Sequence, residues 1–131
     1  MTPFRLERTA TTPEVVLLPQ ERVLVLRGEC YPENPIPLFG QVLASLDRCL
    51  AREGFTSLEV TIQLGYVNSA STKGLRKLFG RLDRAAEAGV SVQLIWEHEV
   101  SDDTMEELGR DLAEDLHFLE LETRAYRVRA A

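Results

Sequence analysis

The chain has 131 residues, with 15 lysines and arginines against 21 aspartates and glutamates, so its formal net charge is −6. This length fits one soluble domain that closes a hydrophobic core without metal or disulfide support, and it excludes a two-domain enzyme. The longest aliphatic runs, 15–18 and 23–26, fall far short of the roughly 20 residues that cross a bilayer, so we expect no membrane span and a single domain over residues 1–131.

The sequence contains none of the usual patterns for a metal, a nucleotide or a nucleic acid. Cys30 and Cys49 form no Cys-x-x-Cys pair, and His98 and His117 match no ligand spacing, so we expect reduced thiols and no metal. The glycines form no phosphate-binding fingerprint, and the acidic excess disfavours a nucleic-acid partner. Residues 1–12 lack the apolar middle of an export signal, which predicts a cytoplasmic protein.

The amino-terminal part predicts a hairpin followed by a helix. Two apolar runs, 14–18 and 22–28, are separated by a short polar turn, which is typical of a strand-turn-strand unit. From Pro35 the apolar residues recur at three-to-four spacing until about Gly54, which predicts a helix with Asn34 as its cap.

The central part predicts a strand, a helix and another strand. Apolar and polar residues alternate over 58–64, as in a strand with one face in water. The helix that follows has the clearest apolar stripe of the chain and ends at Gly89, and a similar alternation returns over 90–96.

The carboxyl-terminal part predicts a third helix and a last strand. The helix starts near Asp103, with Glu106 as a capping-box partner, and the strand covers 118–122. We expect less order at the two ends of the chain, 1–12 and 124–131.

The expected order is therefore β-β-α-β-α-β-α-β in one α/β domain. Three successive strand-helix-strand crossovers imply that the last four strands are parallel with right-handed connections. Because the strands have one polar face, we expect the helices to lie mainly on one face of a mixed sheet.

Two loops at the carboxyl ends of the parallel strands, 28–34 and 66–73, are the expected place for a site. The second loop brings three hydroxyls and an asparagine to the start of a helix. The simplest interpretation is capping of that helix. The alternative is phosphorylation, because free amides at a helix start hold a phosphate, which adds about −1.5 to −2 charges. Ser69 is the first candidate, followed by Ser71 and Thr72.

A hydrolase is the alternative from another functional class. Ser69 as a nucleophile would need a base, and His98 leaves a strand at the same edge of the sheet. No Gly-x-Ser-x-Gly elbow surrounds Ser69, so we predict that the chain is not an enzyme.

Several motifs in register resemble the SiaC-type regulatory phosphoproteins. They are Tyr-Pro-Glu-Asn at 31–34, Tyr-x-Asn-hydroxyl-x-Ser at 66–71 with Lys73, a strand that ends in Trp96, and the run 105–111. The likeness covers about residues 13–121 and implies a STAS-like fold, similar to the SpoIIAA type of anti-sigma-factor antagonist.

The resemblance implies a regulatory protein that exchanges partners and needs no cofactor. In such proteins the hydroxyl after the loop asparagine, here Ser69, is phosphorylated by a cognate serine/threonine kinase and dephosphorylated by a PP2C-type phosphatase. The unphosphorylated form binds a diguanylate cyclase and promotes cyclic-di-GMP synthesis, which regulates biofilms. An anti-sigma-factor antagonist, with the same fold and switch but a kinase or anti-sigma factor as partner, is the alternative.

The sequence departs from the family pattern at several positions. Ser69 replaces a common threonine and keeps a hydroxyl, Ala70 and Cys30 replace serines, Arg110 replaces an acid, and 119–120 replaces a Pro-Phe pair. We expect the partner surface to comprise these residues of the two loops: Tyr31, Pro32, Glu33, Asn34, Tyr66, Asn68, Ser69, Ser71 and Lys73.

Overall fold

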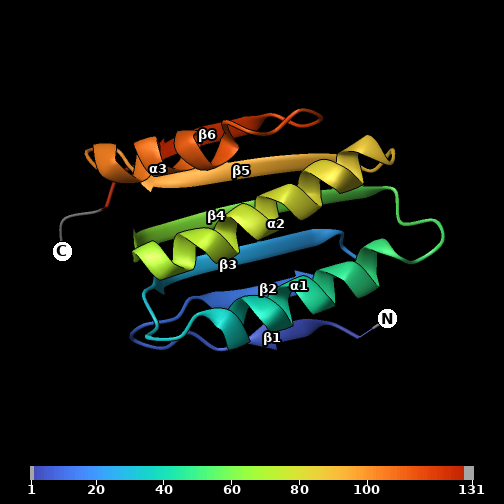
Figure 1. Ribbon diagram of the computed structural model, residues 1–131, viewed down its shortest axis with the longest axis horizontal. Helices are drawn as coiled ribbons and strands as arrows, with labels where there is room; N and C mark the ends of the chain where they lie inside the picture. Colours follow the sequence, from blue (N-terminus) through green and yellow to red (C-terminus); the bar gives the residue numbers. More distant parts are fainter. Residues whose placement is uncertain (1, 129–131) are drawn as a thin grey trace.

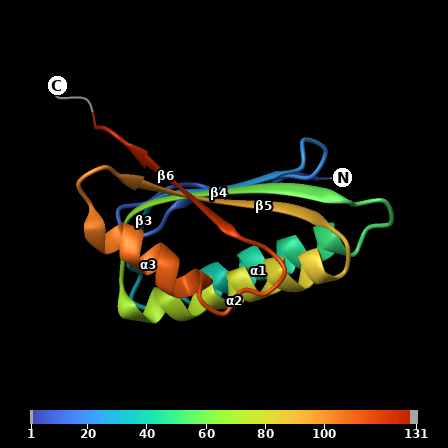
Figure 2. The ribbon, with the colours of Figure 1, turned by 90° about the horizontal axis from the view of Figure 1, so that it is seen from above.

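A computed structural model describes residues 2–128. In this part of the chain, one six-stranded sheet carries three helices on a single face (Figures 1 and 2). The elements in chain order are β1 (Phe4–Leu6), β2 (Glu14–Leu18), β3 (Val23–Cys30), α1 (Ile36–Leu50), β4 (Ser57–Val67), α2 (Ser69–Glu87), β5 (Ser91–Glu99), α3 (Asp103–Ala113) and β6 (Leu121–Tyr126).

The strands lie in the sheet in the order in which they occur in the sequence. β1, β2 and β3 are antiparallel neighbours, whereas β3, β4, β5 and β6 are parallel neighbours. The parallel register places Leu26 beside Ile62, and Ile62 beside Trp96. The predicted hairpin, the four parallel strands and the one-sided layer of helices are therefore confirmed.

Alternating side chains build the core between the sheet and the helices. In β4, the side chains of Leu58, Val60, Ile62 and Leu64 are at most 2% exposed, whereas Glu59 is exposed on the other face. Each fully buried side chain of this kind contributes about 1.5 to 3 kcal/mol to folding. No helix within residues 2–128 has the length and apolar character that crossing a bilayer requires.

Two glycines allow α2 and α3 to approach aromatic rings closely. A Cβ at Gly74 in α2 would overlap the ring of Phe39 in α1, and a Cβ at Gly109 in α3 would lie 2.6 Å from Nε1 of Trp96 in β5. The same indole nitrogen donates a hydrogen bond to the carbonyl of Met105 at 2.9 Å. A larger residue at either glycine would push its helix away from the sheet or from the neighbouring helix.

The ends of the chain contain more strand structure than the sequence predicts. Phe4–Leu6 form β1, which places Arg5 opposite Val16 of β2. Three residues are too few to show an alternation, and β1 depends on the apolar strand beside it. At the other end β6 extends to Tyr126, so part of the segment 124–131 is a strand, and residues 129–131 lie outside the described residues.

α2 begins after the cap that its loop predicts, but the N-cap of α1 is Pro35 and not the predicted Asn34. The N-cap of α3 is Asp102, and Glu106 pairs with Arg110 instead of acting as a capping-box partner. α1 is also shorter than predicted. α1 ends at Leu50 and a turn leads to Gly54, whose φ is 83°. α3 follows Asp102, whose carboxylate accepts a hydrogen bond from the N–H of Met105 at 3.1 Å.

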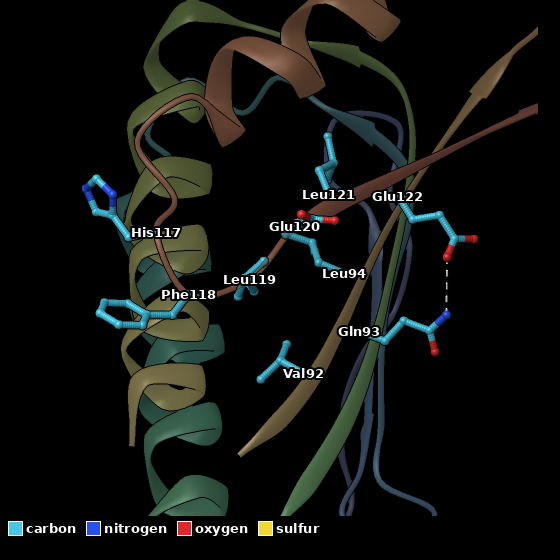
Figure 3. A pocket seen from close by; sticks show the side chains of 9 residues that line it. All are labelled: Val92, Gln93, Leu94, His117, Phe118, Leu119, Glu120, Leu121 and Glu122. Carbon is cyan, nitrogen blue, oxygen red and sulfur yellow. Dashed lines mark hydrogen bonds between the residues drawn. The ribbon is translucent and has the colours of Figure 1, made fainter. Parts of the chain in front are cut away.

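The predicted last strand is present, but its predicted bounds, 118–122, are wrong, because β6 begins at Leu121 and ends at Tyr126. The carboxylate of Asp83 in α2 accepts hydrogen bonds from the N–H groups of three consecutive residues, at 2.8 to 3.2 Å. The donors are His117, Phe118 and Leu119. This contact holds 117–120 along α2 and away from β5 (Figure 3), so pairing with β5 starts only after it.

Gly74→Ala is expected to lower the free energy of unfolding by about 1 to 3 kcal/mol, because the added methyl group displaces the ring of Phe39. Gly80 in the same helix is the matched control, because a Cβ there meets no atom within 4 Å. Gly80→Ala should instead raise the stability by about 0.5 to 1 kcal/mol. Denaturant unfolding measures both changes, and equal effects of the two substitutions would contradict the close approach.

The contact of Asp83 gives the stability a defined dependence on pH. Partial burial of the Asp83 carboxyl opposes its ionisation, but the backbone donors outweigh burial and hold the pKa of Asp83 below its usual range, and His117 adds a smaller attraction. The pKa is therefore lower in the folded than in the unfolded chain. The resulting stabilisation is present above the unfolded value of about 3.9 and is lost as the pH falls through the folded value.

Asp83→Asn is expected to lower the free energy of unfolding by about 1 to 2 kcal/mol at neutral pH, because a charged acceptor is replaced by a neutral one at a partly exposed site. The difference from the wild-type chain should shrink in acid. Thermal unfolding at several pH values tests this, with Glu87→Gln on the exposed side of α2 as the control. A difference that stays constant down to low pH would refute the role given to Asp83.

Candidate functional site

The start of α2 lies at the carboxyl ends of β3 and β4, at the left of Figure 1. Asn68 precedes the helix with extended backbone, and its side-chain oxygen accepts a hydrogen bond from the N–H of Ser71 at 3.0 Å. The expected cap is therefore present. Ser69 is the first helical residue and is exposed.

Asn68 also joins the two loops that were predicted to form the site. Its side-chain amide donates to the carbonyl of Pro32 at 3.0 Å, and its backbone N–H donates to the carbonyl of Cys30 at 3.1 Å. Beside these bonds the rings of Tyr31 and Tyr66 meet edge to face, with centroids 5.5 Å apart. Both tyrosines keep exposed surface, so the two loops present one continuous face.

The three hydroxyls of the α2 loop differ in accessibility. Ser69 is exposed, and the Thr72 hydroxyl is partly buried and donates to the carbonyl of Ser69 at 2.6 Å. Ser71 is fully buried next to Cys30. Burial raises the pKa of the Cys30 thiol, and the Ser71 hydroxyl opposes that rise. The hydroxyl of Ser71 is thus out of reach of a modifying enzyme in this fold, whereas that of Ser69 faces solvent.

The other residues of the predicted partner surface are at least partly exposed. Glu33 and Asn34 face solvent, and the side-chain oxygen of Asn34 accepts a hydrogen bond from the N–H of Ile36 at 3.2 Å, which supports the start of α1. Lys73 is exposed one helical turn after Ser69. Only Ser71 among the predicted residues is turned into the core.

A groove between α1 and α2 opens beside this face. It has a volume of about 380 Å³ and lies where Gly74 lets α2 approach Phe39. Ile36 also lines the groove, although 76% of its surface is exposed, and Lys73 and Lys77 border it. The groove therefore combines an apolar surface with two positive charges.

Sequence reasoning missed the groove and the side chains of α1 that line it. The available signals were Ile36, an apolar residue between two prolines at a helix start, and two glycines, Gly40 and Gly74, on helices that pack together. Neither signal shows by itself that the helices face each other, because that arrangement depends on contacts between distant parts of the chain.

The exposed side of α2 is basic although the whole chain is acidic. Lys73, Arg76, Lys77 and Arg84 face solvent, and Arg81 forms an ion pair with Asp47 of α1. Charges of this kind on an open surface mainly steer association with a partner of opposite potential.

The residues proposed for a hydrolase do not come together. His98 is 5% exposed, and its Nδ1 lies 3.0 Å from the carbonyl oxygen of Glu99. No hydrogen bond joins His98 to Ser69 in the described part of the chain. Residues 2–128 also contain no cluster of side chains that could hold a metal ion.

Comparison with known proteins agrees with the motifs and with this geometry. The profile of the family described as "SiaC family regulatory phosphoprotein" matches residues 6–126. A protein of Pseudomonas aeruginosa is 32% identical over 118 residues, which cover 90% of this chain and 93% of that protein.

Solved structures extend the likeness to three dimensions. Apo-SiaC from Pseudomonas aeruginosa has a TM-score of 0.87 at 31% identity and covers 95% of this chain and 100% of its own. A second structure is SiaC from Pseudomonas aeruginosa in complex with the diguanylate cyclase SiaD, which SiaC activates. It also has a TM-score of 0.87 at 31% identity, and the match covers 94% of this chain and 99% of the SiaC chain. Sequence motifs, topology and family profile agree, and the chain belongs to the SiaC family of regulatory phosphoproteins.

Proposed function

We propose that this chain is a non-catalytic cytoplasmic regulator that binds and activates a diguanylate cyclase, and that phosphorylation of Ser69 releases the cyclase. A serine/threonine kinase adds the phosphate and a PP2C-type phosphatase removes it. The solved complex of SiaC with SiaD supports the choice of partner. The observation that carries the proposal is the exposed hydroxyl of Ser69 at the start of α2, beside an apolar groove.

The helix start is suited to a phosphate on Ser69. Asn68 occupies the N–H of Ser71, but the N–H groups of the first helical residues point out of the helix end, where the dipole favours negative charge. Lys73 lies four residues after Ser69 and can pair with an anion one turn away. A phosphate would therefore stay fixed at the edge of the groove.

A fixed phosphate opposes binding of a partner that covers this edge. It adds about −1.5 to −2 charges that must lose their water when the partner packs against Tyr31, Tyr66 and the groove. It also neutralises part of the positive potential that Lys73 contributes. A loss of about 1.4 kcal/mol already weakens the complex tenfold, so a modest penalty is enough to release the partner.

Ser69→Asp is expected to weaken binding to the cognate cyclase at least about tenfold, whereas Ser69→Ala should bind like the unmodified chain. Titration calorimetry measures both affinities. Ser91→Asp is the matched control, because Ser91 is also exposed but lies at the opposite, amino end of β5. Equal binding by Ser69→Ala and Ser69→Asp, with no phosphate on Ser69 in cells, would remove this residue as the switch.

Ile36→Asp tests the groove as the anchor of the partner. Because Ile36 is 76% exposed, the substitution should leave the unfolding midpoint nearly unchanged, while a charge in an apolar contact should weaken cyclase binding at least about tenfold. Ala44→Asp, on the exposed side of the same helix but outside the groove, is the control and should bind normally. Normal binding by Ile36→Asp would show that the partner docks elsewhere.

A further inference from the structure

The outer edge of β6 is the longer of the two free edges of the sheet. β6 is the last strand in the order, and its main neighbours are β5 and α3. The N–H of Val100 donates to the carbonyl of Tyr126 at 2.7 Å, so Tyr126 directs its backbone groups toward β5. Because these directions alternate along a strand, Leu121, Thr123 and Ala125 direct their N–H and C=O groups away from the sheet.

Two opposite charges flank the centre of this edge. Glu122 lies beside Ile95 and Arg124 beside Glu97. Trp96, between these two residues of β5, packs against Gly109 of α3, so Glu122 and Arg124 are on the sheet face that carries no helix. Both are exposed, and within the chain they form an ion pair. Thr123 lies between them and belongs to the opposite, helix-covered face.

We propose that a second copy of this chain pairs its β6 with this edge in the antiparallel direction, with Thr123 of both copies on the two-fold axis. The free N–H and C=O groups of each Thr123 then bond to those of the other copy, and Leu121 of each copy bonds to Ala125 of the other. The two sheets join into one, with all helices on the same face. Such an interface uses the same patch on both copies, as two-fold dimers require.

Charge selects this register among the alternatives. With Thr123 at the centre, Glu122 of each copy lies opposite Arg124 of the other, and each carboxylate then sits between two guanidinium groups. A shift of the centre by one residue would place Glu122 opposite Glu122, or Arg124 opposite Arg124, and like charges directly opposite each other are destabilising. Charged residues on an edge usually prevent pairing, whereas here their order makes the edge complementary to itself.

The first test is the oligomeric state of the full chain by sedimentation velocity over a range of concentrations. The wild-type chain is expected to dimerise, and Thr123→Pro to remain monomeric, because proline removes an N–H that points out of the sheet and pairs with no other strand among residues 2–128. Thermal unfolding verifies that this variant folds. A wild-type chain that stays monomeric at every concentration, or a dimer that persists in Thr123→Pro, would overturn the proposal.

The second test exchanges the charges and needs no change in the backbone. Glu122→Arg and Arg124→Glu should each weaken the dimer at least about tenfold, because every cross-strand pair then has like charges. A mixture of the two variants should form a heterodimer, and the double variant E122R/R124E should dimerise like the wild type. Failure of both the mixture and the double variant to dimerise would overturn the register.

Varying the salt concentration cannot replace the charge-exchange variants as a test of the pairing between Glu122 and Arg124. α3 packs near the same edge, and its exposed side is acidic, with Asp103, Glu107 and Asp111 in contact with solvent. Added salt would screen repulsion between the helices of two copies as well as attraction between Glu122 and Arg124. The charge exchange leaves the acidic residues of α3 unchanged, and the double variant keeps an ion pair between positions 122 and 124 within each chain. It also leaves Ser69 and the groove intact, so cyclase binding can be measured independently in the same variants.

Discussion

The side chain of Asn68 makes the contacts on which the arrangement of the site depends. Its oxygen caps α2, and its amide group ties the helix start to the loop that follows β3. Because successive helical residues are 100° apart, fixing the first residue of α2 also fixes which hydroxyls face water. Ser69 is left outside and Ser71 is turned into the core beside Cys30. Capping of α2 and phosphorylation of Ser69 are therefore compatible interpretations of this loop. The cap formed by Asn68 fixes the helix start in the orientation that leaves Ser69 exposed to solvent.

The same geometry connects the site to the packing of α1 against α2. Gly74 is one turn from the helix start, and its lack of a side chain lets the ring of Phe39 lie against α2. This contact sets the width of the groove beside Ser69, so a residue of the core helps to define a surface for binding. The stability of the two-helix layer and the shape of the partner surface consequently depend on the same side chains.

Local sequence patterns predicted the parts of the fold that depend on local interactions. The alternation in β4 and the apolar stripe of α2 specify their own structure, and the loop residues Asn68 and Ser69 lie where the order of elements places them. β1, the start of β6 and the groove were missed because each depends on a distant partner. The start of β6 is set by Asp83, which precedes the residues it binds by more than 30 positions. No window of the sequence around 118–122 contains that carboxylate, so periodicity alone predicts a strand there.

The two surfaces proposed for binding use different parts of the sheet and can be occupied together. The groove lies over the ends of β3 and β4, whereas the free edge belongs to β6, and β5 separates the two. A dimer through β6 would present two grooves and two Ser69 hydroxyls on one helix-covered face. A cyclase with two copies of the docking segment would then bind the second site at the high effective concentration created by the first. Phosphorylation of one copy would remove one bound segment of the cyclase and also the high effective concentration at the other site. The affinity of the dimer for the cyclase would therefore fall more steeply with phosphorylation than the affinity of a single site.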